Sequence, residues 1–225
     1  MPESADDPTT DTWLDLTYPI REGVPAWPGQ PPVEVNTLQS IGCVGEAKIS
    51  QIVCSVHTGT HVDGPMHFIE GDAGVLAMPA ELMSGPARVC RIDDAEPHIS
   101  AESLIAYEER TRPLQTGDRL IVRTRNSGRD WSSEPFDPDY AAVTPDAAKL
   151  LVDRGVAAVG CDYLSVAPFD DPATTHRILL HARVWVVEGL DLRQVSEGEG
   201  AWLVAPLAIA GADAAPARSL YRPRT

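Results

Sequence analysis

The segment from Val56 to Phe68, VHTGTHVDGPMHF, concentrates side chains that bind metals and move protons. It holds three of the six histidines in the chain, His57, His61 and His67, together with Asp63. Two imidazoles and a carboxylate form a ligand set that suits zinc, manganese or iron(II). Three protein ligands leave one coordination position open, as in catalytic metal sites, and water bound there becomes a nucleophile near neutral pH.

The spacing in this segment favours an extended backbone. His57, His61 and Asp63 all occupy odd positions, and residues two apart in a strand point to the same side, so we expect these side chains to converge. The glycines and the proline between them disfavour a helix, which excludes a helical H-E-x-x-H zinc site. His67 could be a fourth ligand, or a general acid and base beside the metal.

Other interpretations of these residues stay open. One histidine alone is usually structural, but three at this spacing around an aspartate favour a metal site. Spacing does not separate a catalytic site from a metal-binding site without turnover. A cysteine hydrolase using Cys54 and His57 is weaker, because Cys54 follows an apolar run in which a buried thiol is usually inert.

Length and composition predict a single domain of ordinary globular character. The 225 residues include 33 acidic and 18 basic side chains, and the net charge of -15 argues against binding to nucleic acid or to an anionic membrane. No apolar run approaches the ~20 residues of a membrane span. The four cysteines form no C-x-x-C pair, and residues 1–12 do not resemble a signal peptide. We therefore expect a cytoplasmic protein with a mobile tail (1–12) and one hydrolase domain (13–225).

Strand-like runs outnumber helical ones along the chain. Helices are expected over 100–110, capped by Ser100, and over 144–155, capped by Thr144 and ended by Gly155. Several of the strand runs are continuously apolar, as in strands that are covered on both faces. The pattern predicts one α/β domain with a mixed sheet, whose strands cover residues 13–18, 47–56, 87–92, 118–124, 156–161, 182–189 and 201–209.

The segment HTGTHVDGPMHF resembles the H-x-G-T/A-H-x-D-x-P-x-H-F/Y signature of the metal-dependent cyclase/amidohydrolase family, which includes bacterial kynurenine formamidases and isatin hydrolases. The resemblance covers nearly the whole chain. LDLTYPIREGVPAWPGQPP is similar to the N-terminal strand and P-x-W-P-G segment of the family, and VGCDYLSVAPFDDPATTH to its G-x-D-x-x-S stretch. VVEGLDL and LVAPLAIAGADAAPARSLY are similar to its C-terminal strands. The resemblance implies a strand-rich, swivelling β/β/α-type fold.

The resemblance also implies a role for individual residues. One divalent metal would be bound by His57, His61 and Asp63, and Asp63 would bridge to a second one held by His176 and Glu188. The expected metal is Zn²⁺, two per subunit, with Mn²⁺ as the alternative. The remaining roles are proton transfer at His67 and an aromatic wall of the substrate pocket at Trp27.

The residues themselves support part of this assignment. Glu188 follows the apolar run RVWVV, and a carboxylate there is costly to bury unless it is paired or bound to metal. His176 alone is weak evidence, because DDPATTH could equally be a solvated loop. His98 and His181 match no motif position and are expected to be structural.

The implied activity is metal-dependent hydrolysis of a small aromatic amide in a homo-oligomer. N-formylkynurenine would be cleaved to kynurenine and formate by attack of a metal-bound hydroxide, with His67 as the proton carrier. A sister hydrolase or cyclase acting on isatin, a lactone or another cyclic amide is the alternative, and a metal-binding protein without activity is a more distant one.

Two features depart from the family pattern. Ala167 stands where formamidases often have a second aspartate, which affects the expected shape of the pocket. The stretch 127–143 resembles an insertion, and its aromatic residues Trp131, Phe136 and Tyr140 could form a lid or simply pack within a loop.

Overall fold

A computed structural model describes residues 12–42, 45–92 and 97–224, so all of the expected tail except Thr12 lies outside the described residues. The α-helices are α1 (Ala80–Met83), α2 (Ala101–Arg110), α3 (Pro145–Asp153) and α4 (Pro172–His181). The strands are β1 (Leu14–Asp15), β2 (Glu34–Gln39), β3 (Ile49–Val53), β4 (His61–Asp63), β5 (Ser84–Arg91), β6 (Arg119–Arg123), β7 (Ala158–Cys161), β8 (Trp185–Glu188), β9 (Gly198–Pro206) and β10 (Ala214–Pro223).

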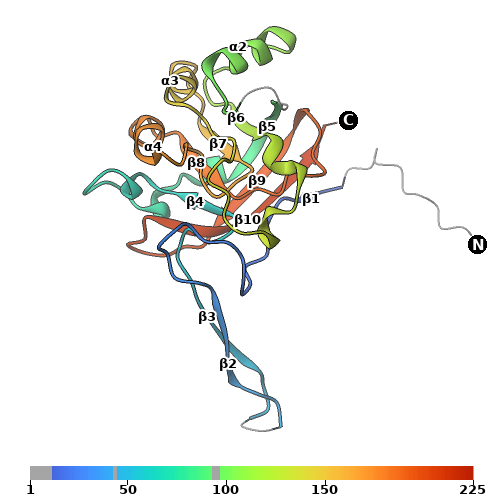
Figure 1. Cartoon of the computed structure of the whole chain (residues 1–225), viewed down its shortest axis with the longest axis vertical. Coiled ribbons are helices and arrows are strands. Elements are labelled where there is room, and N and C mark those ends of the chain that lie inside the picture. The colour runs from blue at the N-terminus through green and yellow to red at the C-terminus, as the bar shows by residue number, and fades with distance from the viewer. Residues whose placement is uncertain (1–11, 43–44, 93–96, 225) are drawn as a thin grey trace, which may run out of the picture.

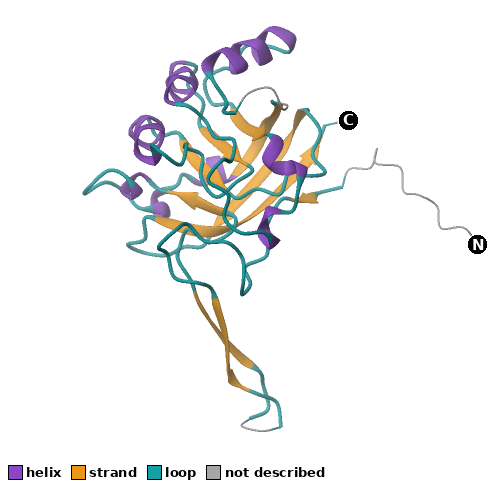
Figure 2. Ribbon diagram, in the orientation of Figure 1, coloured by secondary structure: helices purple, strands orange, loops and turns teal. Residues whose placement is uncertain are grey.

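A mixed sheet of eight strands forms the body of the molecule (Figures 1 and 2). Its order is β1-β10-β4-β8-β7-β6-β5-β9, and β9 also pairs with β10. The sheet therefore closes into a barrel, in which β5, β6, β7 and β8 are mutually parallel and the other pairings are antiparallel. The expected α/β domain with a mixed, strand-rich sheet is confirmed.

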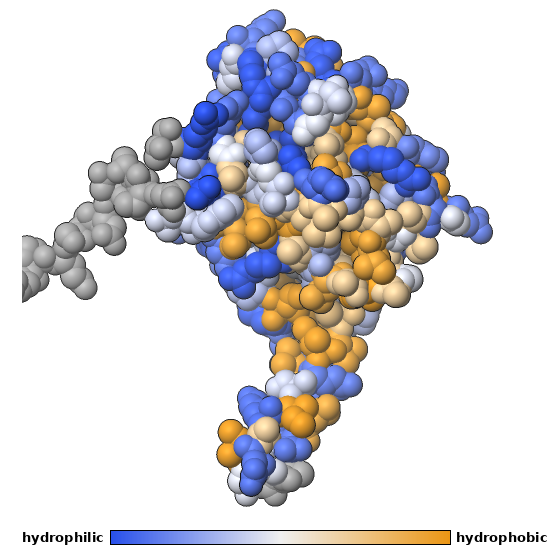
Figure 3. Space-filling view, turned by 180° about the vertical axis from the view of Figure 1, so that it is seen from behind, coloured by the Kyte–Doolittle hydropathy of each residue, from blue (hydrophilic) through white to orange (hydrophobic). Residues whose placement is uncertain are grey.

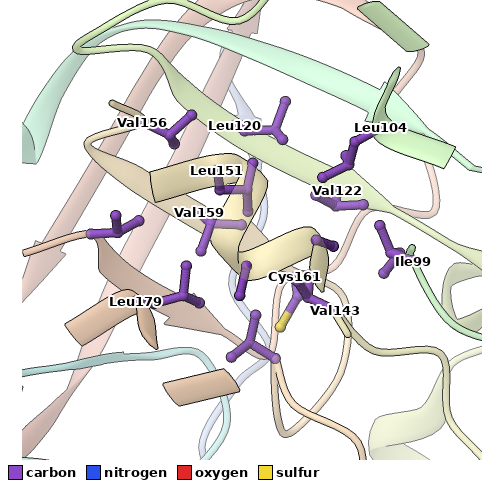
Figure 4. Close-up of a cluster of buried hydrophobic side chains, with 14 of the residues drawn as sticks. Ile99, Leu104, Leu120, Val122, Val143, Leu151, Val156, Val159, Cys161 and Leu179 are labelled. Carbon is purple, nitrogen blue, oxygen red and sulfur yellow. The ribbon is translucent and has the colours of Figure 1, made fainter. Parts of the chain in front are cut away.

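The parallel strands are covered on both faces. Helices α2, α3 and α4 lie along the outer face of β5–β8 (Figure 1), and Leu120 and Val122 of β6 point into the apolar layer beneath them (Figure 4). Ile121, between these two residues, belongs to a second apolar cluster with Trp185 and Val187 of β8. This alternation confirms the expectation, drawn from their continuous apolar sequences, that these strands are buried on both sides.

The two expected helices form where they were predicted, but only one of the two predicted side-chain caps is present. Ser100 caps α2 by accepting a hydrogen bond from the Ser103 amide, and Pro145 occupies the first turn of α3. The Thr144 hydroxyl donates to the carbonyl of Ile99 instead of capping α3. Among the described residues, no helix is long and apolar enough to cross a membrane.

Strands β2 and β3 form a hairpin arm that projects away from the barrel (Figures 1 and 3). We expected the run 47–56 to be a strand, and β3 is one, but every residue of β3 is exposed rather than covered. Val35 and Ile52 lie opposite each other across the arm, and their side chains are 46% and 52% exposed. The apolar sequence of β3 thus reflects an uncovered surface of this chain, not a buried strand.

A buried aspartate holds the segment that leads into the stretch 127–143. Asp162, at the end of β7, accepts hydrogen bonds from the Thr124 amide at 2.7 Å, the Thr124 hydroxyl at 2.8 Å and the Ser127 hydroxyl at 2.6 Å. Trp131 and Tyr140 are buried in an aromatic cluster, so loop packing is the correct description for both.

Replacing Asp162 with Ala is expected to lower the free energy of unfolding by about 3 kcal/mol, because it leaves several buried donors without a partner. Denaturant unfolding measures this loss. The matched control is Asp153→Ala, which removes an exposed carboxylate from α3 and should cost less than about 0.5 kcal/mol. Equal losses in the two variants would contradict the anchoring role of Asp162.

Candidate metal centre and active site

Strand β4 carries two of the predicted ligands into the middle of the barrel wall. It pairs with β10 on one side and with β8 on the other, and His61 and Asp63 are completely buried. His61 and Asp63 are two residues apart on one strand, as predicted.

His57 reaches the same point by a different route from the one expected. The chain turns at Gly59, whose φ of +62° lies in the left-handed region, so His57 precedes the strand instead of extending it. The turn fits closely against Gly189, where an added Cβ would lie 2.3 Å from the Gly59 carbonyl oxygen. The alternation argument was therefore wrong for His57, although the convergence of the three side chains that it predicted is observed.

Asp63 lies between two groups of nitrogen and oxygen ligands. Its Oδ1 lies 3.1 Å from Nδ1 of His57 and 3.5 Å from Nε2 of His61. Its Oδ2 lies 3.4 Å from Nε2 of His176, which is 3.0 Å from Oε1 of Glu188. The two oxygens of one carboxylate thus face two different sets of side chains.

Helix α4 supplies His176, and this part of the sequence was predicted poorly. The segment DDPATTH was considered a possible solvated loop, but Pro172 begins a helix whose cap is Asp171, and His176 is 3% exposed. The ring of Phe68 stacks on His176 with a centroid distance of 4.5 Å and an interplanar angle of 22°.

Backbone carbonyls orient two of the imidazoles. Nδ1 of His61 is 2.9 Å from the Gly59 carbonyl oxygen, and Nδ1 of His176 is 2.6 Å from that of Pro172. Because a carbonyl only accepts, each Nδ1 atom donates a proton, and each Nε2 atom is the ring nitrogen that faces the carboxylates of Asp63 and Glu188 and is placed to bind a metal. Metal-ligating histidines are held in this way in known sites.

The arrangement fits a divalent metal ion. Nε2 of His61 and both oxygens of Asp63 are fully buried, and Nε2 of His61 also lies 3.2 Å from Oε2 of Glu188. Burying carboxylates and ring nitrogens together is costly, and a cation bound between them would offset that cost. The separations of 3.0–3.5 Å within the two sets match the ~3.4 Å edge of a tetrahedron with ~2.1 Å bonds. A nitrogen and oxygen donor set without sulfur suits zinc or manganese.

The charges of the site are strongly coupled. Burial works to lower the pKa of His57 and of His176, but the neighbouring carboxylates outweigh it and raise the pKa to about 9 for His57 and about 10 for His176. Burial opposes ionisation of Asp63, yet the surrounding histidines hold its pKa well below the usual range. Without metal, the buried carboxylates are therefore balanced by protonated imidazoles.

His67 lies beside the ligand sets, and it also forms a group of potential metal ligands with Asp63 and His176. It ends the short turn Pro65–His67, its ring centroid is 4.1 Å from that of His57, and one of its ring nitrogens lies within 4.8 Å of ligand atoms on Asp63 and His176. Burial lowers the pKa of His67, which leaves its imidazole neutral near pH 7. A neutral imidazole beside the metal centre is able to accept a proton.

A pocket opens over the metal centre. His57, His67, His176 and Glu188 form its base, and Trp27, Phe68, Leu164 and Pro172 supply its apolar wall. Phe136 and Phe169 lie against Trp27 with centroid distances of 5.5 and 5.3 Å. Of the aromatic residues considered for a lid, Phe136 is thus the one beside the pocket.

Two polar residues of the site were missed at the sequence level. Asp213 places Oδ2 within 2.9 Å of Nε2 of His57 and 3.1 Å of Nδ1 of His67. Asp213 is the only charged residue between Ala201 and Ala217. A lone carboxylate in an apolar stretch is costly to bury unless it is paired, and this argument, used above for Glu188, would also have identified Asp213. Gln30 lines the pocket with a buried Oε1 that has no hydrogen-bond partner, and no sequence signal marks it.

The other residues singled out in the sequence lie elsewhere. Ala167 is fully buried in the core and is not among the residues that line the pocket. His98 and His181 belong to no cluster of potential metal ligands in residues 12–42, 45–92 and 97–224. Both ring nitrogens of His57 face carboxylates, which disfavours its pairing with Cys54.

Residues 14–168 match the sequence profile of the Cyclase family, which is more than half of the chain. The chain belongs to the Cyclase family. This cyclase-family chain is 30% identical over 216 residues to a kynurenine formamidase of Bacillus cereus, covering 95% of this chain and 99% of that protein. The resemblance seen in the sequence is confirmed.

Solved structures share the fold of this cyclase-family chain. A structure described as a potential metal-dependent hydrolase with cyclase activity is 32% identical, with a TM-score of 0.82 and coverage of 95% of this chain and 98% of that one. A predicted metal-dependent hydrolase from Bacillus stearothermophilus is also 32% identical, with a TM-score of 0.80 and coverage of 95% and 98%. Isatin hydrolase A from Labrenzia aggregata, at 22% identity, has a TM-score of 0.81 and coverage of 95% and 94%.

Zinc binding to this cyclase-family chain is expected to release about one to two protons at pH 7, because the pKa values of about 9 for His57 and about 10 for His176 keep both imidazoles protonated in the metal-free protein. Affinity should therefore rise with pH up to this range. Calorimetric titration in two buffers of different ionisation enthalpy measures the release, and His181→Ala is the control that should not change it. Binding at pH 7 without proton release would contradict the charge balance described above.

Proposed function

We propose that this protein is a metal-dependent amidohydrolase that cleaves N-formylkynurenine to kynurenine and formate. One observation carries the proposal: a buried carboxylate between two ligand sets lies beside a neutral histidine at the base of an aromatic pocket. The kynurenine formamidase of Bacillus cereus, similar over nearly its whole length, supports this choice of substrate.

The roles proposed for the residues follow their positions. His57, His61 and Asp63 hold one divalent ion, and Asp63, His176 and Glu188 hold the other, with Zn²⁺ as the first choice and Mn²⁺ as the alternative. Divalent metal, when bound, polarises the substrate carbonyl and lowers the pKa of water. Because the ligands are buried and bulk water is excluded, electrostatic interactions at this site are stronger than they would be in water.

His67 is the proposed proton carrier. The oxygen of water adds to the formyl carbon, the C–N bond breaks, and the amine nitrogen leaves with a proton. His67 accepts the proton of the attacking water and delivers it to that nitrogen, and its lowered pKa supports the first of these transfers. The neutral ring is regenerated at the end of the cycle.

The pocket wall supports an aromatic substrate with a hydrogen-bond donor. Trp27 and Phe68 offer faces for stacking on an aromatic ring, and Leu164 completes an apolar contact. The unpaired Oε1 of Gln30 is an acceptor for an N–H group of the substrate, since a buried oxygen gains most when it is paired. An arylformamide carries both an aromatic ring and an N–H group.

We also propose that the protein is a homo-oligomer in which a second copy covers the hairpin arm. A two-stranded hairpin standing alone in water is marginally stable. The arm nevertheless leaves several large apolar side chains exposed, which are Val35, Leu38, Ile41, Ile49, Ile52 and Val53. Because the cross-strand pair of Val35 and Ile52 shares one face, this face supports a contact with a partner subunit.

Purified protein is expected to hydrolyse N-formylkynurenine, to lose this activity with a chelator and to regain it with zinc or manganese. His67→Ala should lower kcat by about 10²- to 10⁴-fold while metal content stays unchanged, and release of kynurenine measures both effects. His98→Ala is the control. Two bound metals with no turnover of this substrate would overturn the formamidase assignment and direct testing to isatin, lactones and other cyclic amides.

Ile52→Glu should shift the protein towards the monomer, because it places a charge on the apolar face that the proposed partner subunit covers. Sedimentation velocity over a range of protein concentrations measures the shift. Gln51→Glu is the matched control, since Gln51 lies on the same strand and points to the opposite face of the arm. A wild-type protein that sediments as a monomer at all concentrations would contradict the proposal.

A further inference from the structure

Asp213 brings one carboxylate oxygen to two histidines with different proposed tasks. Its Oδ2 lies 2.9 Å from Nε2 of His57, a proposed metal ligand, and 3.1 Å from Nδ1 of His67, the proposed proton carrier. The Asp213 side chain is 37% exposed, whereas that of His57 is 12% exposed. The carboxylate therefore closes the solvent-facing side of the pair of rings.

The backbone holds Asp213 in this place. Its carbonyl oxygen accepts a hydrogen bond of 2.7 Å from the Gly64 amide, and the next residue, Ala214, pairs with Asp63 across β10 and β4. Gly64 is closely enclosed here, since an added Cβ would lie 3.0 Å from the Asp213 carbonyl oxygen. The position of the carboxylate thus follows from the closure of the barrel by β10.

The contacts determine which nitrogen of each ring carries a proton. A carboxylate oxygen accepts hydrogen bonds, so the ring nitrogen of each histidine that faces Oδ2 of Asp213 is the one that donates. His57 therefore donates through Nε2, and its Nδ1 is left facing Asp63 at 3.1 Å. His67 donates through Nδ1, and its Nε2 is left as the nitrogen able to accept a proton.

We propose that Asp213 is a positioning residue that orients His57 for metal binding and His67 for proton transfer through the same carboxylate oxygen. This inference rests on the proposed function. It extends to His57 the arrangement seen at His61 and His176, whose second nitrogens donate to backbone carbonyls. It differs from them in that one oxygen couples a metal ligand to the proton carrier.

Asp213→Ala is expected to weaken zinc binding by about 10- to 100-fold in competition with a chromogenic chelator, because second-shell partners of metal-bound histidines contribute this much. At saturating zinc, kcat should fall at least about 10-fold while KM changes less than about threefold. Asp213→Asn keeps an oxygen acceptor of the same shape and should lose less on both measures. Asp72→Ala, which removes a carboxylate paired with Arg183 at 2.8 Å, is the matched control.

A double variant tests whether Asp213 acts through His67. In the His67→Ala background, Asp213→Ala should cause no further loss of kcat, since residues that act as a unit are not additive. The loss of zinc affinity should persist in this background, because it arises at His57. Circular dichroism and thermal unfolding of each variant separate these effects from misfolding, and Asp213→Asn carries the test if the alanine variant does not fold.

The outcomes that overturn the inference are distinct from those that overturn the proposed function. Wild-type affinity and kcat in Asp213→Ala would refute the positioning role while leaving the function intact. Equal losses in Asp213→Ala and Asp213→Asn would show that the negative charge of Asp213 is responsible, and would refute positioning through its hydrogen bonds. Loss of one bound zinc with unchanged affinity for the rest would make Asp213, His57 and His67 a separate cation site. A wild-type protein that binds no metal would refute both proposals.

Discussion

The burial of the Asp63 carboxylate is the constraint on which the rest of the site depends. Both of its oxygens are buried in the middle of a closed sheet, with imidazole nitrogens of His57 and His176 as near neighbours. Such a group is stable only when cations or protonated donors surround it. The imidazoles on either side meet this need in the metal-free protein through raised pKa values, and metal ions meet it when they bind. The same carboxylate therefore explains the ligand sets, the coupled charges and the orientation of the rings.

The grouping of most candidate site residues and part of the fold could be predicted from the sequence. The histidine segment could be interpreted because its ligands are close together in sequence, and Glu188 because a carboxylate after an apolar strand is unusual. The strands of the parallel region are continuously apolar, α2 begins at a capping serine, and α3 has a proline in its first turn. Each of these signals lies within a short segment of the sequence, so it can be recognised without a structure.

The features that were missed depend on contacts between distant parts of the chain. The route of His57 depends on the turn at Gly59 and on its fit against Gly189. Helix α4 has a proline and two threonines at its start and gains stability from packing on the sheet, so DDPATTH looked like a loop. The prediction that β3 is covered was wrong because an apolar strand has the same sequence pattern whether it is buried in a barrel or left uncovered by the rest of the chain.

Strand β10 has a consequence for the order in which the molecule forms. It pairs with β1, β4 and β9, closes the barrel and follows Asp213 directly. The ribosome makes it after every residue proposed to hold metal, from His57 to Glu188. Until β10 emerges, one edge of β4 has no partner, and the interior between β4 and β9 stays open to water. The nascent chain thus carries all the proposed metal ligands before it has the strand that shields them from water. A metal ion bound at that stage would occupy a less rigid and more hydrated site than the one in the finished protein.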